Sequence, residues 1–465
     1  MTTGKVHKFR AQPAVQQPQS AALPTAEIFP KAKVFYFVGR EFAPHSGELT
    51  LHYRLEPGPQ LTERYRFPLP PPGTRPPPPD AFAAALDLVH WLAGVSYWKS
   101  AIPGRWHFAG KRPDDAQLAL LDDVYRHGLA EFAHRNALEL PAIEVTGLAP
   151  APAVPSRPEA PLAAQAITAF GGGKDSFVAV EQIRRLGIAQ SLAIVGSPEL
   201  AQRAAARTGL PVLTVERRLA PELAALNAAG AYNGHVPITA IHSAVLTVLA
   251  LLHDCRFVVF ANERSADSAT LVTRDGTAVN HQWSKSLAFE RAFAAYLERH
   301  VGGVEYFSLL RPWHEVAVCR QFAALEQYHA HFSSCNRHFH LAGSRIAGRW
   351  CGVCAKCRFV FLGLAPFLPR PALEAIFGCN PLAEAEAVTP YRHLLGLAGE
   401  RPFECIGTVD ECRAALAALA GRDEWRAAAV VAALAAEMPA SPPLASFLTA
   451  TGEHRVPHEF RDALD

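Results

Sequence analysis

The 465-residue sequence predicts an α/β protein: a doubly wound parallel sheet with an N-terminal α+β domain and a helical C-terminal region. Three observations lead to this prediction. Short apolar strands alternate with helices from residue 164 to residue 261, a glycine-rich loop joins one of these strands to its helix, and the residues after 370 are rich in Ala, Leu and Glu at helical spacing. Strand–helix alternation is typical of crossover units, which place ligands beyond the carboxyl ends of parallel strands.

The composition and the charge exclude several classes of protein. Hydrophobic residues make up 49% of the chain and charged residues 19%, which is enough apolar material for a core and excludes global disorder. The net charge of +2 argues against a nucleic-acid partner. The longest apolar stretches, Ala244–Leu252 and Phe359–Leu368, are about half of the ~20 residues that a membrane span needs, and no secretory signal is recognisable. We therefore expect a cytoplasmic protein without a membrane partner; the sequence does not indicate a protein partner.

The first 160 residues predict a tail, an α+β domain and a linker. Residues 1–30, rich in Ala, Pro and Gln, predict a flexible tail, and residues 31–150 predict the N-terminal α+β domain. Five prolines make Ala149–Pro161 the best candidate for a linker. The elements predicted inside the domain are a β-hairpin of strands Val34–Val38 and Glu48–Leu55, a proline-rich loop from Pro68 to Pro79 and a helix over Asp80–Ala101.

Residues 160–370 predict the catalytic domain, and residues 371–465 predict a helical C-terminal domain. The predicted strands of the catalytic domain are Ala166–Phe170, Ser191–Val195, Val212–Val215 and Phe257–Ala261. The predicted helices between and after them are Phe177–Leu186, Glu199–Thr208 and Pro237–His253, with Val409–Ala420 and Asp423–Glu437 in the C-terminal domain.

The strongest motif is a glycine-rich loop between a predicted strand and a predicted helix. Glycines let backbone amides approach phosphate oxygens, and the positive end of the following helix attracts the same anion. The spacing excludes a Walker A loop and a dinucleotide fingerprint, because Asp175 follows the lysine and no further glycine follows. A plain glycine turn is the alternative without a ligand. The residues expected to hold phosphate and its magnesium ion are Gly171, Gly172, Gly173, Lys174, Asp175 and Ser176.

A cysteine cluster predicts a metal site. Nine cysteines are too few for a disulfide scaffold, but four of them fall within a short segment that contains two overlapping Cys-x-x-Cys units. Four thiolates suit tetrahedral Zn²⁺ in a closed, structural site. An iron–sulfur cluster or a redox pair are alternatives to zinc, and His331, His338 and His340 are alternatives for the fourth ligand. The predicted ligands are Cys335, Cys351, Cys354 and Cys357.

Three polar stretches lie where a ligand is expected. Asn262–Asp267 follows a predicted core strand, Asn280–Ser286 opens a helix and Tyr232–Pro237 precedes the long helix. Each one alone is as well explained by a hydrogen-bonded loop. Because all three are expected near one sheet edge, together they favour a binding site.

These motifs, taken in order, resemble two known families. The loop at 171–176 is similar to the pyrophosphate loop of N-type ATP pyrophosphatases (PP-loop enzymes), Ser-Gly-Gly-x-Asp-Ser, with Gly171 in place of the usual serine. Those enzymes cleave ATP between its α and β phosphates and adenylate an oxygen of the substrate. From Phe35 onward, most of the chain resembles the UDP-N-acetyl-α-D-muramoyl-L-alanyl-L-glutamate epimerases, the MurL family. The segments that carry this likeness are the glycine loop, Asn233–Ala240, Asn262–Ser265, Asn280–Ser286, Ser334–Asn336 and Trp350–Cys357.

The resemblance implies an ATP- and Mg²⁺-dependent epimerase of peptidoglycan precursor synthesis, and hence a role in cell shape and division. It would convert the terminal L-Glu of UDP-MurNAc-L-Ala-L-Glu to D-Glu through an adenylated carboxylate, releasing AMP and pyrophosphate. We expect the proton carriers among Glu263, His281 and Lys285, with Arg264 holding a substrate carboxylate or diphosphate, and Cys335 as an alternative carrier. The alternative functions are an adenylating enzyme of tRNA or deazaguanine modification, as in queuosine synthesis, and a non-catalytic nucleotide-binding scaffold.

Overall fold

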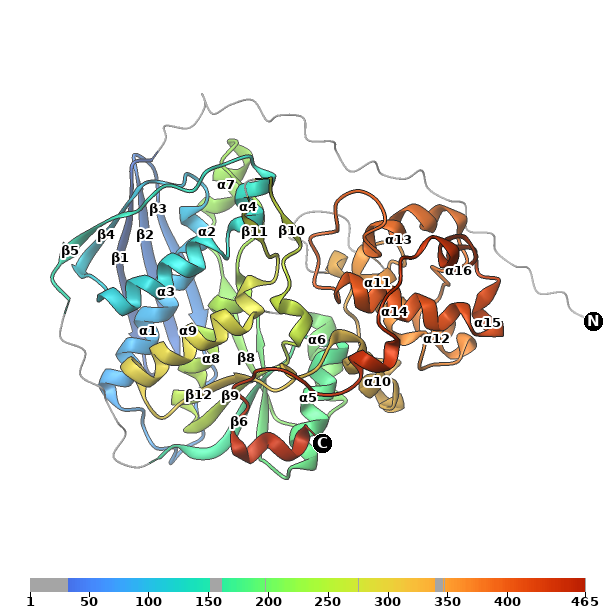
Figure 1. The fold of residues 1–465 in the computed structure, drawn as a ribbon. Coiled ribbons are helices and arrows are strands. Elements are labelled where there is room, and N and C mark those ends of the chain that lie inside the picture. The colour runs from blue at the N-terminus through green and yellow to red at the C-terminus, as the bar shows by residue number, and fades with distance from the viewer. Residues whose placement is uncertain are drawn as a thin grey trace, which may run out of the picture.

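A ten-stranded sheet forms the centre of the computed structural model (Figure 1). The structure describes residues 32–150, 161–196, 198–274, 276–338, 346 and 348–464; the predicted tail, most of the predicted linker and His340 lie outside them. In order across the sheet, the strands are β12 (Glu305–Ser308), β9 (Cys255–Phe260), β6 (Ala163–Ala169), β7 (Gln190–Val195), β8 (Val212–Arg218), β3 (Gln60–Arg66), β2 (Glu48–Glu56), β1 (Val34–Ala43), β4 (Arg105–Lys111) and β5 (Glu144–Leu148). A separate two-stranded hairpin pairs β10 (Leu271–Val272) with β11 (Ala278–Val279).

Five neighbouring strands form a parallel region, as the sequence predicts, and β1, β4 and β5 are also paired in parallel at the far end of the sheet. Strands β12, β9, β6, β7 and β8 are all paired in parallel, and each of the four predicted strands of this region is confirmed to within a few residues. Strand β6 comes first in the chain but lies in the middle, with β7 on one side and β9 on the other. The connections therefore run in opposite directions from β6 and β9, which opens a crevice at the carboxyl ends of these two strands.

The N-terminal strands continue the same sheet, which the sequence did not indicate. The predicted hairpin is confirmed as β1 and β2, but β3 then pairs antiparallel with β8. Glu63 of β3 forms a buried ion pair with Arg217 of β8 at 2.6 Å. The α+β region of residues 31–150 and the parallel region therefore share one sheet and a common core.

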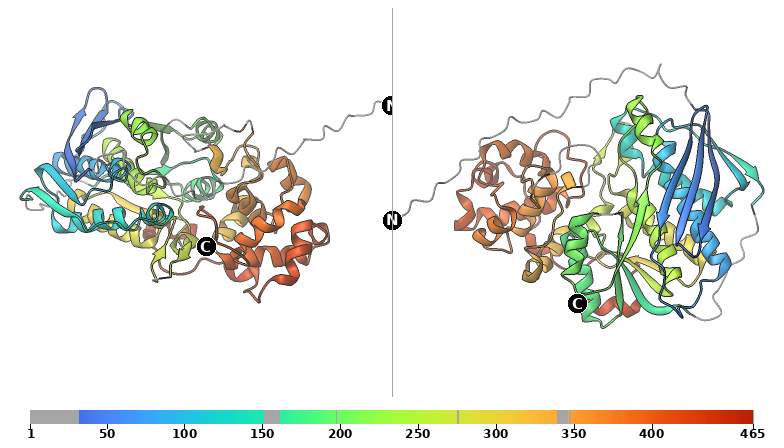
Figure 2. Two further views of the ribbon diagram at one scale, coloured as in Figure 1. Left: turned by 90° about the horizontal axis from the view of Figure 1, so that it is seen from above. Right: turned by 180° about the vertical axis from the view of Figure 1, so that it is seen from behind.

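Helices cover both faces of the sheet because alternate strand residues point to opposite sides. In β6, Ala166 packs in the core of one face and Ile167 in the core of the other. The helix predicted over residues 80–101 is divided at Gly94, where an added Cβ would come within 2.8 Å of Phe37. The face of Ile167 carries α1 (Pro79–Ala93), α2 (Val95–Trp98), α3 (Asp115–Arg126), α8 (Ile238–Leu252) and α9 (Leu287–Tyr296). The face of Ala166, seen from behind in Figure 2, carries α5 (Lys174–Arg185), α6 (Glu199–Ala206) and α10 (Glu315–Ala323).

A helical lobe beside the sheet contains the C-terminal part of the chain (Figure 1). The predicted helix over 409–420 is confirmed as α14, whereas the helix predicted over 423–437 is divided into shorter pieces. The chain then returns to the sheet, where Phe460 packs against Phe257 and Phe307 with ring centroids 4.9 and 4.8 Å away. The lobe helices are α11 (Ala355–Leu364), α12 (Arg370–Phe377), α13 (Val388–Leu394), α14 (Val409–Ala420), α15 (Asp423–Arg426) and α16 (Ala429–Leu434).

Two short helices, α4 (Ala130–Arg135) and α7 (Glu222–Ala228), complete the fold. Among the described residues, none of the helices combines the length and the apolar character that a membrane span requires.

Candidate functional site

The glycine loop connects β6 to α5 at the crevice between β6 and β9. Gly172 has φ +78°, a conformation that favours glycine, and the amide of Gly171 donates to Ser176 Oγ at 3.1 Å. Apart from Gly171 and its two neighbours in the chain, no heavy atom of the described residues lies within 4 Å of the position that a Cβ on Gly171 would take. The loop therefore has open space above it at the amino end of a twelve-residue helix, which is a suitable place for an anion.

The lysine of the loop is buried and turned toward two carboxylates. Lys174 is fully buried, its ammonium lies 2.9 Å from Glu315 Oε1 and it also contacts Asp175. Burial alone would lower the pKa of Lys174, but Asp175 and Glu315 raise it well above its usual value. Glu315 begins α10 and also pairs with Lys356 at 3.3 Å. Burial would raise the pKa of Glu315, yet the two lysines lower it to about 2. Lys174 thus ties the loop to α10, and its contact with phosphate stays a prediction.

Glu263, which follows β9, belongs to an acidic group beside the loop that also includes Asp175, Glu315 and Glu411. Glu263 is buried, and its Oε2 accepts a hydrogen bond from the Ser265 amide at 2.5 Å. Burial raises the pKa of Glu263 well above its usual value, and the nearby carboxylates of Glu315, Glu411 and Asp175 raise it further. These effects favour the protonated form of the Glu263 carboxyl, which can donate a hydrogen bond.

Arg264, the residue after Glu263, contacts a distant part of the chain. Its Nη1 donates to Thr451 Oγ1 at 2.9 Å, on the segment that returns from the lobe to the sheet. The predicted contact of Arg264 with substrate stays a prediction, because the guanidinium here joins two parts of the chain.

His281, Lys285 and Cys405 form a second polar cluster. Lys285 Nζ donates to Cys405 Sγ at 3.1 Å, and His281 also hydrogen-bonds this thiol. His281 Nδ1 contacts Glu131, which lies 3.3 Å from His235 Nδ1. Two of the predicted proton carriers thus meet at a cysteine that no sequence motif marks.

The groups of this cluster stabilise one another's charged forms. Burial would raise the pKa of Cys405, but Lys285 and His281 lower it to about 5. Burial would lower the pKa of His281, but Cys405 and Glu131 raise it to about 9. At neutral pH the pair is therefore a thiolate and an imidazolium.

The two polar clusters lie next to each other. Lys356 contacts the carbonyl of Cys405 with the same ammonium that pairs with Glu315, and Glu315 pairs in turn with Lys174 of the loop. The charges of Asp175 and Glu263 also act on Lys285. The glycine loop, a buried carboxyl group and the Cys405 thiol are therefore brought together at one end of the sheet.

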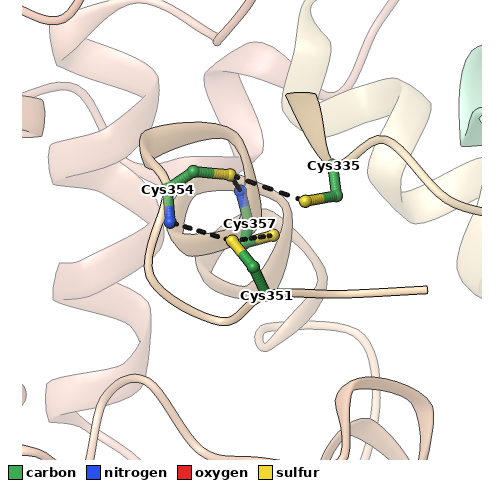
Figure 3. A group of neighbouring side chains, drawn as sticks. All are labelled: Cys335, Cys351, Cys354 and Cys357. Carbon is green, nitrogen blue, oxygen red and sulfur yellow. Dashed lines mark hydrogen bonds between the residues drawn. The ribbon is translucent and has the colours of Figure 1, made fainter. Parts of the chain in front are cut away.

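The four predicted cysteine ligands converge at the start of α11 (Figure 3). Their sulfur atoms all lie within 4.8 Å of one another, with 3.7 Å between Cys351 and Cys357 and 4.0 Å between Cys335 and Cys354. Sulfurs about 2.3 Å from one tetrahedral ion would be spaced by nearly these distances. The amides of Cys354 and Cys357 donate to Cys351 and Cys354 sulfurs at 3.3 and 3.4 Å, as in a metal-binding turn. The set could hold a metal ion, and its donors suit zinc.

Of the histidines considered as fourth ligand, His331 and His338 lie within the described residues, and neither joins the four cysteines. His338 Nε2 is 3.1 Å from the carbonyl of Arg349. A further group of possible metal ligands among the described residues consists of Glu131, His235 and His281.

Comparisons with known proteins agree with one another. The model of the MurL N-terminal domain matches residues 27–309, and the model of the MurL C-terminal domain matches residues 331–446. The chain is similar to proteins named UDP-N-acetyl-alpha-D-muramoyl-L-alanyl-L-glutamate epimerase. The relative from Xanthomonas oryzae is 44% identical over 91% of this chain and 95% of its own length, and that from Micromonospora is 40% identical over 90% and 95%. The relative from Salinispora tropica is 39% identical over 92% of this chain and 95% of its own length. No solved structure matches the chain significantly.

Proposed function

The chain belongs to the UDP-N-acetyl-α-D-muramoyl-L-alanyl-L-glutamate epimerase family, and from this premise we propose that it inverts the terminal L-Glu of UDP-MurNAc-L-Ala-L-Glu in an ATP-dependent reaction. The substrate follows from the names of its relatives. The use of ATP rests on one observation: the glycine loop lies beside a cluster of proton-transfer groups, where an ordinary epimerase would need no anion-binding loop.

The chemistry explains why an epimerase would consume a nucleotide. Removal of the α-hydrogen beside a free carboxylate is very unfavourable, because the carbanion forms next to a negative charge. If the carboxylate is first joined to AMP, the resulting mixed anhydride carries no such charge, and its carbonyl oxygen accepts the electron pair as an enolate. A side-chain base can then remove the hydrogen. Reprotonation on the opposite face inverts the centre, and hydrolysis releases AMP.

The residues of the loop fit a triphosphate. The open space above Gly171 and the amino end of α5 provide the place for its β and γ phosphates, with Ser176 as a hydroxyl donor. Asp175, in the loop itself, would offer a carboxylate to a magnesium ion, which would neutralise phosphate charge. The ion pair between Lys174 and Glu315 holds the loop against α10.

The cysteine set would hold a structural zinc ion. Four protein ligands leave no open position for substrate. The ion would fix the segment of Cys335 to the start of α11, and Ser334 of that segment lies against Gly173 of the loop.

Epimerisation, with the family established, is a better account of the site than tRNA or deazaguanine modification. All of these reactions would begin with adenylation, so the substrate that accepts the adenylyl group distinguishes them. The net charge of +2 offers no strong electrostatic attraction for a tRNA backbone.

Substrate-dependent pyrophosphate release tests this proposal. The protein with ATP and Mg²⁺ should release pyrophosphate and AMP when UDP-MurNAc-L-Ala-L-Glu is added, and not when a deazaguanine acid or tRNA is added. Asp175→Asn should reduce the rate by about 100-fold or more, because the metal–phosphate contact is lost. Asp115→Asn, whose carboxylate is 97% exposed at the start of α3, is the matched control and should be fully active. Formation of ADP instead of AMP would contradict the proposal.

A further inference from the structure

Cys405 lies in the loop between α13 and α14 and projects toward the parallel sheet. It is half-buried, and its sulfur accepts a hydrogen bond from Lys285 at 3.1 Å. Lys285 ends a short 3₁₀ segment, Trp283–Lys285, which directly precedes α9 on the sheet. The lobe and the sheet therefore meet at this thiol.

The surroundings of Cys405 are those of an activated thiol rather than a core cysteine. Three cationic groups face it from three elements: Lys285, His281 from the loop before it, and Lys356 from α11. Glu404 on the same loop is an acidic neighbour, and its carboxylate accepts a hydrogen bond from Asn336. Cys319 and Cys412, by comparison, are fully buried, and burial raises their pKa values. Cations gathered around one thiol stabilise its thiolate.

His281 is held by a further residue. Its Nδ1 contacts Oε2 of Glu131, and the other carboxylate oxygen pairs with Arg135 at 2.7 Å. A thiol, a histidine and a carboxylate thus form a continuous chain, as in sites where a histidine positions and charges a reactive sulfur. Glu131 is buried on α4, far along the sequence from Cys405, so that the arrangement arises only in the folded chain.

We propose that the Cys405 thiolate is the base that takes the α-hydrogen of the substrate glutamate, with Lys285 and His281 as positioning residues. The inference rests on the proposed function, since it needs an activated carboxyl group beside the carbon that loses its hydrogen. The geometry supports this inference. Lys356 contacts the carbonyl of Cys405 and pairs with Glu315, and Glu315 pairs with Lys174 of the glycine loop. The nucleotide and the thiolate would therefore act on neighbouring atoms of one substrate.

Apart from the adenylated substrate and Cys405, the proton transfers require only water. The C–H bond at the α-carbon breaks, the proton forms an S–H bond at Cys405, and the electron pair moves into the adjacent carbonyl group as an enolate. On its opposite face the enolate takes a proton from water. The hydroxide ion that remains receives the proton of the thiol, which restores the thiolate. No oxidation occurs, and the only net change at the substrate is inversion.

A metal ion at Glu131, His235 and His281 is the competing explanation of this cluster. Two observations favour the ion pair. Both oxygens of Glu131 already have cationic partners, and His281 is engaged by Glu131 and by Cys405. A metal ion would have to displace these contacts.

Two readouts on the full chain separate this inference from the proposed function. With UDP-MurNAc-L-Ala-L-Glu, ATP and Mg²⁺ in deuterated water, Cys405→Ser should release pyrophosphate at a rate within about threefold of the unaltered chain, which also reports that the variant folds. Deuterium incorporation at the glutamate α-carbon should fall by about 100-fold or more, since a catalytic base is lost. Cys255→Ser, at the opposite end of β9, is the matched control and should keep both activities.

The outcomes are distinct. Full deuterium incorporation by Cys405→Ser overturns the inference and leaves adenylation intact. Inversion by the unaltered chain without pyrophosphate release overturns adenylation, even if Cys405→Ser fails to exchange. A second metal ion per chain that is lost in His281→Ala also overturns the inference.

Lys285→Met provides a readout that a structural role would not affect. The base must be deprotonated, so exchange by the unaltered chain should be lost as the pH falls through the pKa of Cys405, about 5. Without the ammonium of Lys285 that pKa rises, and the midpoint of exchange should move upward by at least about one pH unit. An unmoved midpoint contradicts the role of Lys285 and of the thiolate.

Discussion

Glu315 is the residue on which the buried charges beside the glycine loop depend. One carboxylate pairs with both Lys174 and Lys356, which are buried, and Asp175 is the other acidic partner of Lys174. A buried ammonium without a partner is costly, because it has lost its hydration and gained no opposite charge. Removal of this carboxylate would therefore weaken the support of the loop, because Lys356 would lose this acidic partner and Lys174 would keep only Asp175 of its two.

Replacement of Glu315 by Gln should lower the free energy of unfolding by about 3 kcal/mol at pH 7. The pKa of Glu315 is lowered to about 2 in the folded chain, whereas a free glutamate titrates near 4.3, so the advantage of the unaltered chain is complete above pH ~4.3. It should disappear as the pH falls from there to about 2. Urea unfolding at several pH values measures the difference.

Glu199→Gln is the matched control for this measurement. Glu199 pairs with Arg203 on α6, but both side chains are more than two-thirds exposed, at 72% and 73%. An exposed pair contributes less than about 1 kcal/mol, so this variant should unfold almost like the unaltered chain. An equal loss in both variants would show that burial of the Glu315 pair has no special effect.

Residues with catalytic chemistry could be predicted only where they belong to a local pattern. Lys285 and His281 were selected because a polar stretch opens a helix, and the structure brings both to one thiol. Cys405 itself stands alone between Glu404 and Ile406, outside any Cys-x-x-Cys unit. Its environment is made by residues about 120 positions earlier, which no spacing rule in the sequence reveals.

At the scale of single elements, the loop before α11 shows how much short spacing can predict. Cys351, Cys354 and Cys357 lie on one turn and one helix start, so their convergence is a local property of the chain. Gly352 has φ +71°, and a Cβ there would meet Cys379 Sγ at 2.7 Å, which explains the glycine in the turn. Cys335 reaches the same point from a separate segment, so its place among the ligands depends on the fold and not on short spacing.

The purified chain should contain one zinc ion, and Cys351→Ser should lose it, because three thiolates bind zinc less tightly than four. Removal of the ion should also lower the temperature of unfolding, since a structural zinc site contributes to folding. Cys379→Ser, which removes an exposed neighbouring cysteine outside the ligand set, should keep the metal. Elemental analysis and thermal unfolding measure both effects; iron in place of zinc, with visible absorption, would show a different metal centre.

At the scale of the whole molecule, the order of strands accounts for the position of the site. The loops after β6 and β9 carry the glycines and Glu263, and the reversal of strand order between them leaves the crevice open. The lobe then contributes Cys405 and Lys356 from the other side. Catalysis of the proposed kind would need both parts in contact, with the phosphate loop supplied by one and the base by the other.

The parallel strands β6, β7, β8 and β9 could be predicted from the sequence, but the continuation of the sheet through the N-terminal strands could not. Alternating strands and helices are local patterns, so β6, β7, β8 and β9 were found from the sequence. The pairing of β3 with β8 joins residues about 150 positions apart, and the buried ion pair of Glu63 with Arg217 that accompanies it has no local signal. Long-range pairing of this kind decides whether two predicted regions form separate bodies or one sheet.

The transfer of an oxygen atom tests the central claim, adenylation of the glutamate carboxylate, most directly. UDP-MurNAc-L-Ala-L-Glu labelled with ¹⁸O in the α-carboxylate is incubated with ATP and Mg²⁺, and the AMP is analysed by mass spectrometry. Because a carboxylate oxygen attacks the α-phosphate and remains on it after hydrolysis at the carbonyl carbon, the AMP formed should carry ¹⁸O while D-Glu accumulates. Inversion of glutamate accompanied by AMP without ¹⁸O, or by no AMP at all, would contradict the account.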